Sequence, residues 1–339
     1  MLIKKKGVIA AAALLGASVL LGACGSASTE GSTSLKLSHF WPSHHIVHTQ
    51  VLEKFGSDLE SETNGAVTLE LYPGGSLGTP PEQYDLATTG TADIALSVHG
   101  YTSGKFPLVE VMDLPFVVTS SEEGSKKLWE LYKEFPELQE EHGDTHPLAL
   151  FTGEPNQILS KDKPIERLED LRGLKVRSPS TLGNEILEAV GAVPVSMPVN
   201  DIYESLNKGV IDAALAGVST VNDLNLHEVV DHVTIANLSA SSMFITMNKD
   251  QYDQLPEEEK EKFDALSDKL SQHAGAALDQ GGQDGLDKAA EVGINVIELS
   301  SEEQENFEKS LQPVIDKWIK DKEADGLPGQ SIYDAATAK

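Results

Sequence analysis

Arginine is the scarcest charged residue in this chain, and its placement is the first chemical signal. Arg167, Arg172 and Arg177 are the three arginines, and all lie within eleven residues. Arg177 closes a predicted strand at residues 174–177, directly before a Ser-Pro pair. A guanidinium at a strand end can bind a carboxylate through two parallel hydrogen bonds. The pattern alone fits an exposed strand residue equally well, so both interpretations stay open.

A second candidate group consists of histidines. Four of the ten histidines lie within ten residues: His39, His44, His45 and His48. His44 and His48 share one face of a predicted helix, and imidazole pairs at this spacing can bind a metal ion. No second His/Asp/Glu cluster stands out, so we favour a polar helix start beside a cleft over a metal site.

No catalytic motif accompanies these residues. A Gly-x-Ser-x-Gly elbow, a Walker loop and a dinucleotide glycine fingerprint are all absent from strand–turn–helix settings in the sequence. The single cysteine excludes a disulfide framework and any multi-cysteine site. We therefore expect a protein that is not an enzyme and needs no cofactor or metal.

The overall charge narrows the range of partners. Lys plus Arg number 26 and Asp plus Glu number 54, which gives a formal charge of −28. Nucleic-acid binding needs clustered Lys and Arg, so a nucleic-acid partner is not expected. Anionic lipid headgroups are disfavoured for the same reason. Hydrophobic residues make up 40% of the chain, which is enough for a packed core.

The N-terminal residues predict export. Lys4, Lys5 and Lys6 precede an apolar run at residues 7–20, and the segment closes with Leu-Gly-Ala-Cys at Cys24. This is the pattern of a signal peptide over residues 1–23, and its end resembles a bacterial lipobox. We expect Cys24 to carry the lipid and residues 24–34 to form a Gly/Ser/Thr-rich tether. The protein would then be extracytoplasmic and lipid-anchored at the outer face of the cell membrane.

The elements that position these residues repeat once along the chain. Gly90-x-x-Asp93 leads into a predicted strand at 94–97, and Gly209-x-x-Asp212 leads into one at 213–216. Strand–helix–strand units before each repeat predict two similarly wound α/β lobes with mainly parallel sheets. Ligands in such sheets bind beyond the carboxyl ends of the strands, where loops of facing lobes meet. A helix is expected from 256 to about 291, and the tail after Gly326 is expected to be loose.

Residues 171–179 read Leu-Arg-Gly-Leu-Lys-Val-Arg-Ser-Pro. This segment gives the best match to a known family, because it closely resembles the signature of the DctP-type solute receptors of TRAP (tripartite ATP-independent periplasmic) transporters. The match continues at residues 190–198, 201–203 and 209–212, and upstream at 63–65, 75–78, 90–93 and 113–116. The resemblance covers nearly the whole chain after the predicted signal peptide.

This resemblance implies a fold and a function. The family has the two-lobed periplasmic-binding-protein fold (type II), with a ligand cleft between the lobes and a long helix crossing both. Lobe I is expected at 35–152 plus about 239–285, and lobe II at 153–238 plus about 286–339. Members capture small organic acids and pass them to small and large TRAP membrane subunits, driven by an ion gradient.

The resemblance also implies site residues. The family's carboxylate-binding arginine falls on Arg177. Gln157, beside Asn156, stands where sialic-acid members have a second arginine, and Ala216 lies where several members place Glu or Asn. The pocket should therefore be less polar than theirs and suit a monocarboxylate with an apolar body. The other candidate wall residues follow or end the first strand of lobe I and its matching strand: Phe40, Trp41, Ser97, His99 and Tyr101.

Three alternatives remain from the sequence. An ABC-type receptor for organic solutes shares this fold and location. A metal-binding lipoprotein would use the His39–His48 cluster. A secreted enzyme on the same scaffold would need a nucleophile and base that no motif supplies.

Overall fold

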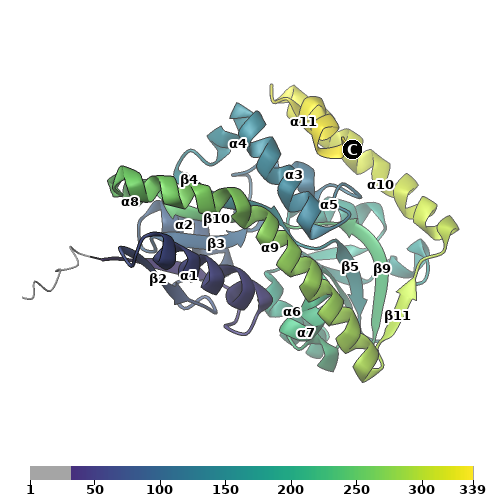
Figure 1. The fold of residues 1–339 in the computed structure, drawn as a ribbon. Coiled ribbons are helices and arrows are strands. Elements are labelled where there is room, and N and C mark those ends of the chain that lie inside the picture. The colour runs from purple at the N-terminus through teal and green to yellow at the C-terminus, as the bar shows by residue number, and fades with distance from the viewer. Residues whose placement is uncertain (1–31, 339) are drawn as a thin grey trace, which may run out of the picture. The chain divides into compact units, whose positions relative to one another are not determined.

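The computed structural model describes residues 32–338. The predicted signal peptide, Cys24 and the tether as far as residue 31 lie outside the described residues. Within the described part, no helix is both long enough and apolar enough to cross a membrane. Two sheets and the helices around them build this part of the chain (Figure 1).

The first sheet has five strands in the order β2-β1-β3-β10-β4. Their bounds are β1 Thr33–His39, β2 Val67–Tyr72, β3 Ile94–Val98, β4 Thr145–Thr152 and β10 Ser242–Asn248. Strands β1, β2 and β3 pair in parallel, whereas β10 runs antiparallel to both of its neighbours.

The second sheet has six strands in the order β11-β9-β5-β8-β6-β7. Their bounds are β5 Asn156–Ser160, β6 Lys175–Ser178, β7 Val193–Ser196, β8 Ala213–Ala216, β9 His232–Ser239 and β11 Asn295–Glu298. Only β5 is antiparallel to its neighbours. Each sheet thus contains one reversed strand, and the prediction of two mainly parallel sheets is confirmed.

The repeated Gly-x-x-Asp motif has the same physical role in both sheets. The Asp93 carboxylate accepts the backbone N–H of Lys36 at 2.7 Å, and the Asp212 carboxylate accepts that of Lys175 at 2.8 Å. Each aspartate thereby holds a backbone N–H of the neighbouring parallel strand, in the middle of β1 or at the start of β6. The glycine three residues earlier has φ near +70° in both motifs, a conformation that side chains disfavour.

The chain crosses between the sheets at three places. Strand β4 leads directly into β5, and β9 leads into β10, so each sheet receives its reversed strand from a crossing. The third crossing is helix α9, Glu257–Val292, which runs past elements of both sheets in Figure 1. Gly275 and Gly285 let it approach closely, because a Cβ atom there would overlap the backbone oxygens of Ser121 and Val218.

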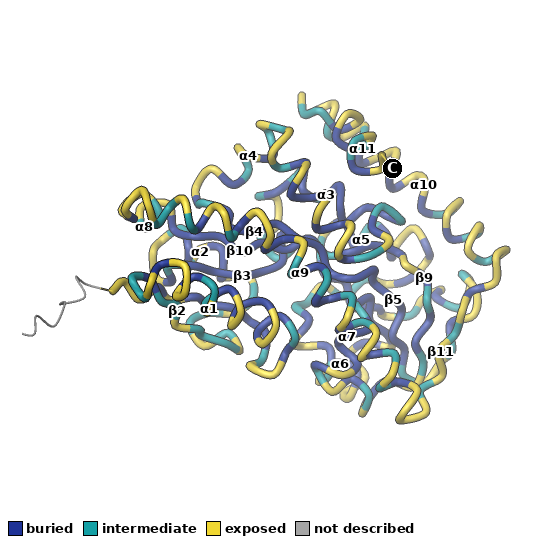
Figure 2. Tube along the Cα trace, in the orientation of Figure 1, coloured by how far each residue is buried: buried dark blue, intermediate teal, exposed yellow. Residues whose placement is uncertain are grey.

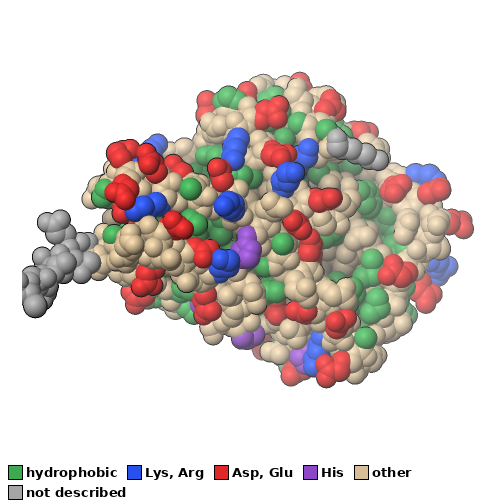
Figure 3. Space-filling model, in the orientation of Figure 1, with side chains coloured by type: hydrophobic (Ala, Val, Ile, Leu, Met, Phe, Trp, Pro, Cys, Tyr) green, Lys and Arg blue, Asp and Glu red, His purple; other side chains and the backbone are tan. Residues whose placement is uncertain are grey.

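The remaining helices pack around the sheets. They are α1 Glu53–Glu62, α2 Gln83–Thr88, α3 Ser121–Glu134, α4 Pro136–Glu141, α5 Thr181–Ala189, α6 Ile202–Asn207, α7 Ser219–Asp223, α8 Lys249–Gln254, α10 Ser301–Ala324 and α11 Gly329–Thr337. Figure 2 shows the central strands buried and the outer helix faces exposed. Acidic side chains are spread over the visible face in Figure 3, with lysines between them.

The C-terminal tail corrects one expectation. Residues after Gly326 were expected to be loose, but α11 is a helix with Ile332 and Ala336 buried. Its contacts with α3 and α10 hold it in place. The apolar residues of this short segment are few, and only their tertiary partners make the helix stable.

Candidate functional site

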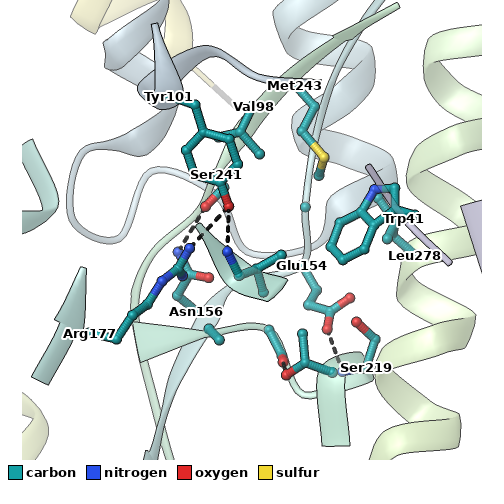
Figure 4. A pocket seen from close by; sticks show the side chains of 15 residues that line it. Trp41, Val98, Tyr101, Glu154, Asn156, Arg177, Ser219, Ser241, Met243 and Leu278 are labelled. Atoms are coloured by element: carbon teal, nitrogen blue, oxygen red, sulfur yellow. Dashed lines mark hydrogen bonds between the residues drawn. The ribbon is translucent and has the colours of Figure 1, made fainter. Parts of the chain in front are cut away.

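A pocket lies where the carboxyl ends of strands from both sheets meet, as expected for sheets of this kind (Figure 4). Strand β3 and the segments after β1 and β3 contribute Val98, Trp41 and Tyr101. Strands β6 and β8 contribute Arg177 and Ala216. The full lining is Trp41, Val98, Tyr101, Gly153, Glu154, Asn156, Arg177, Val199, Ala216, Gly217, Ser219, Thr220, Ser241, Met243 and Leu278.

Arg177 is the one basic side chain in this lining, and the protein holds it rigidly. It projects from β6 and is only 2% exposed. Its Nε donates to the Met197 carbonyl at 3.0 Å, and its Nη1 donates to the Leu215 carbonyl at 2.9 Å. Its Nη2 donates to the Tyr101 hydroxyl at 3.1 Å. These three bonds fix the plane of the guanidinium before any ligand arrives.

Arg177 has N–H groups that make no hydrogen bond to the described part of the protein. A guanidinium has five N–H groups, so three bonds leave one N–H free on each terminal nitrogen. No described carboxylate forms an ion pair with Arg177, and burial lowers the pKa of this guanidinium from its usual value. A buried cation without an acidic partner is unfavourable, and an anionic ligand would supply the missing charge.

Tyr101 supplies a further donor at the same point. Its hydroxyl oxygen accepts hydrogen bonds from Arg177 Nη2 at 3.1 Å and from the Val199 backbone N–H at 3.0 Å. With both lone pairs used, its own O–H can only donate. Tyr101 follows β3 of the first sheet, while Arg177 and Val199 belong to segments of the second. The hydroxyl therefore links the two sides of the pocket and can also donate to a bound anion.

An apolar wall lies on the opposite side of the pocket. Trp41, Met243 and Leu278 lie away from Arg177 in Figure 4. The Trp41 ring stacks on His45 at 3.8 Å between ring centroids and packs on Phe40 at 4.5 Å. A ligand held at Arg177 would thus place its body against an aromatic ring that is itself supported from behind.

The structure places five of the predicted ligand-contact residues in the pocket lining: Arg177, Asn156, Trp41, Tyr101 and Ala216. Two others lie just outside because side chains alternate along a strand. Gln157 follows Asn156 on β5 and points elsewhere, with its Oε1 accepting the N–H groups of Ala236 and Asn237. Ser97 precedes Val98 on β3, and its hydroxyl donates to the Pro80 carbonyl.

Phe40 and His99 also lie outside the lining. Phe40 is fully buried between the rings of Trp41 and Tyr101, so it supports the wall without forming it. His99 is buried with its Nε2 3.1 Å from His142 Nε2, and its ring packs on Phe106 and Phe244. Both side chains therefore pack in the protein core, beside strands of the first sheet.

The histidine cluster does not converge as metal ligands do. His39 Nε2 lies 2.9 Å from His48 Nδ1, so these two rings bond to each other. His45 instead accepts the Val47 N–H, and its other nitrogen faces Asp223 at 3.6 Å. Burial lowers the pKa of His39 and of His45 to about 3. Among residues 32–338, no group of three His, Cys, Asp or Glu side chains could hold a metal ion.

Several lining residues escaped the sequence analysis. Glu154 follows β4 at a Gly-Glu-Pro turn, and its charge in an otherwise uncharged stretch was the available signal. Met243 and Ser241 come from β10 and the turn before it, whose place beside β3 no local pattern indicates. Leu278 lies on α9 within an apolar stripe that the sequence assigns simply to the core.

Comparison with known proteins now adds to this geometry. The model for bacterial extracellular solute-binding proteins of family 7, DctP, matches residues 37–321. The chain belongs to this family. It is 27% identical over 298 residues to the C4-dicarboxylate-binding periplasmic protein DctP of Rhodobacter capsulatus, covering 84% of this chain and 86% of that protein.

Two solved structures are similar over most of the chain. One is a TRAP solute-binding protein from Rhodoferax ferrireducens with copurified benzoate (TM-score 0.87, 29% identity, covering 91% of this chain and 97% of that one). The other is a marine metagenome TRAP solute-binding protein from an unidentified microbe, specific for aromatic acid ligands, with 3-hydroxybenzoate. It has the same TM-score, identity and coverage.

Family membership establishes the general role. As a DctP-type protein, the chain is an extracytoplasmic receptor for a small organic solute and works with TRAP membrane subunits. The family consists of solute-binding proteins and not enzymes. The two-lobed fold implied by the sequence resemblance is confirmed, and the alternatives of an ABC-type receptor and of metal capture are not favoured. The exact lobe boundaries stay a prediction.

Proposed function

We propose that this receptor captures a monocarboxylate with an aromatic or similarly apolar body and holds the carboxylate through Arg177. The observation that carries the proposal is the buried guanidinium with one free N–H on each terminal nitrogen. A carboxylate can accept both hydrogens and, in addition, the O–H of Tyr101. Closure around the ligand removes water and strengthens these charged hydrogen bonds.

The rest of the lining supports an apolar ligand body. Trp41, Met243 and Leu278 offer aromatic and aliphatic surface on the side facing away from Arg177, and Val98 adds aliphatic surface beside Tyr101. Similar chains were solved with benzoate and with 3-hydroxybenzoate, which are aromatic monocarboxylates. Aromatic acids are therefore the first class of ligand to test.

Calorimetry on purified protein tests this proposal. Benzoate, 3-hydroxybenzoate, a branched aliphatic acid and a keto acid would be titrated into wild type, Arg177→Ala and Arg172→Ala. Arg172 is exposed on the same stretch of chain and is the matched control. We expect an aromatic acid to bind wild type and Arg172→Ala alike, and Arg177→Ala to lose binding. Near wild-type affinity in folded Arg177→Ala would overturn the proposal.

We further infer that Cys24 is lipidated and anchors the receptor to the outer face of the cell membrane. The Leu-Gly-Ala-Cys sequence after an apolar segment with three lysines supports this assignment. The Gly/Ser-rich residues after Cys24 would let the receptor reach its membrane subunits.

Fractionation of cells tests the anchor. Full-length chain expressed in a bacterial host should incorporate labelled fatty acid and sediment with membranes. Cys24→Ala should lose the label, while Cys24→Ala and wild type should bind the same ligand equally. Labelling that survives in Cys24→Ala would contradict the anchor without affecting the ligand site.

A further inference from the structure

Glu154 is an acidic residue in the lining of a pocket built to take an anion. Its side chain is 8% exposed. Its Oε1 accepts the backbone N–H of Ser219 at 2.6 Å, while its Oε2 has no hydrogen-bond partner among the described residues. Figure 4 shows Glu154 and Arg177 on different sides of the pocket.

Two glycines make room for this carboxyl group. A Cβ atom at Gly217 would overlap the Glu154 carboxyl group, and one at Gly282 of α9 would lie 3.6 Å from its Cδ. Gly217 directly follows β8, so the end of that strand and the long helix enclose the carboxyl group from two sides. The missing side chains at Gly217 and Gly282 therefore leave the space in which the Glu154 carboxyl group lies.

No cation compensates Glu154. Within the described chain no Lys, Arg or His forms an ion pair with it, and the charged groups that act on it from α7 and α9 are Asp223 and Asp279. Burial, together with these two acids, raises the pKa of Glu154 to about 7. An additional negative charge beside Glu154 would meet this acidic side chain, and the one cation in the lining, Arg177, lies on a different side of the pocket.

We propose that Glu154 is the specificity-determining residue that excludes dicarboxylates from this pocket. The inference rests on the proposed function, because it takes one ligand carboxylate to be held at Arg177. The remainder of the ligand then lies on the side of Glu154 and the apolar wall. A second carboxylate there would lose its water and gain only repulsion, whereas a neutral hydroxyl or amide would not.

A matched ligand pair isolates the charge. Benzene-1,3-dicarboxylate and 3-carbamoylbenzoate have nearly the same shape and differ in one negative charge. In wild type at about pH 8, where Glu154 is largely ionised, we expect the amide to bind at least about tenfold more tightly than the dicarboxylate. Glu154→Gln should reduce that ratio by about tenfold, because glutamine keeps the size and removes the charge. Glu188→Gln on the exposed surface of α5 removes the same charge and should leave the ratio unchanged.

A pH series gives a second test. The ratio in wild type should shrink as the pH falls towards about 6, because protonation of Glu154 removes the repulsion. Asp223 on α7 and Asp279 on α9 face the same group, and Arg177 and Tyr101 complete the ionisable lining. In Glu154→Gln the ratio should stay flat over this range, which separates the effect of Glu154 from that of the two aspartates.

If that variant does not fold, calorimetry of wild type in buffers of different ionisation enthalpy provides the test. Binding of the dicarboxylate should be accompanied by the uptake of more protons than binding of the amide.

The outcomes separate this inference from the proposed function. If benzoate fails to bind wild type, or binds Arg177→Ala normally, the proposed function is wrong. If benzoate binds as proposed but the amide-to-dicarboxylate ratio is the same in Glu154→Gln and wild type, only the role of Glu154 is wrong. Equal proton uptake by the two ligands in wild type would contradict that role as well.

Discussion

Ser38 and Arg177 occupy the same position in two sheets that are wound alike. In the first sheet Ser38 of β1 pairs with Ala95 of β3, and in the second Arg177 of β6 pairs with Ala214 of β8. Each lies two residues after a lysine whose N–H is held by the aspartate of the repeated motif. Both side chains are buried at the carboxyl end of a strand.

The two positions differ in whether the side chain reaches the pocket and offers hydrogen-bond donors there. The Ser38 hydroxyl is fully buried with no hydrogen-bond partner among the described residues, and it does not line the pocket. Arg177 crosses into the pocket and carries two free N–H groups. The comparison teaches that each sheet provides a buried strand end at this position. A single residue type, arginine, then gives the second sheet N–H groups in the pocket that could bind the proposed carboxylate.

After the loss of binding in Arg177→Ala, the next largest effect concerns the shape of the cation. Arg177→Lys keeps the charge but cannot hold Met197, Leu215 and Tyr101 while also presenting two parallel N–H groups. We expect it to weaken binding of an aromatic acid by about tenfold or more, measured by calorimetry with thermal unfolding as the check on folding. Wild-type affinity in the lysine variant would show that charge alone suffices and would weaken the geometric account.

A smaller effect is expected from the residue that links the two sides of the pocket. Tyr101→Phe removes the hydroxyl that accepts from Arg177 and Val199. We expect affinity to fall by about three- to tenfold, mainly through faster dissociation, because one donor to the carboxylate and two cross-pocket bonds are lost. Stopped-flow fluorescence of the pocket tryptophan, Trp41, would measure the dissociation rate. Phe40, which packs on Tyr101, offers a control. Phe40→Leu should lower the free energy of unfolding, and its order of preference among the ligands should stay that of wild type.

The repeated aspartates test whether the two sheets are stabilised alike. Asp93→Ala and Asp212→Ala each remove one side-chain bond to a strand N–H. We expect similar losses of about 1 kcal/mol in the free energy of unfolding for both, measured in urea. A loss confined to one variant would mean that the two motifs, although alike in sequence, do not carry equal weight.

The smallest effect is expected at Ser38. Ser38→Ala removes a buried hydroxyl without a partner, so stability should stay the same or rise slightly, and ligand affinity should not change. Thermal unfolding with and without ligand would show both. A clear loss of affinity in Ser38→Ala would break the contrast with Arg177, since it would place the first sheet's strand end in the ligand site too.

The sequence predicts the scaffold better than the pocket. The Gly-x-x-Asp repeat and the strand–helix–strand pattern are local, so the parallel strands follow from them. Helix α9 matches the helix expected from 256 to about 291. Arg177 and Trp41 lie next to strand ends and were within reach of the same reasoning. Met243 and Ser241 were not, because β10 joins the first sheet after the chain has traversed the second. Asn156 and Gln157 show the limit of register: adjacent residues on β5 face different ways, and only one meets the pocket.

The most direct test of the central claim pairs a change in the ligand with a change at Arg177. Benzoate and benzamide differ at the group that Arg177 should bind, and each would be titrated into wild type and Arg177→Ala by calorimetry. If Arg177 binds the carboxylate, wild type should strongly prefer benzoate, and the preference should nearly vanish in the alanine variant. A preference for benzoate that persists undiminished in folded Arg177→Ala would contradict the account.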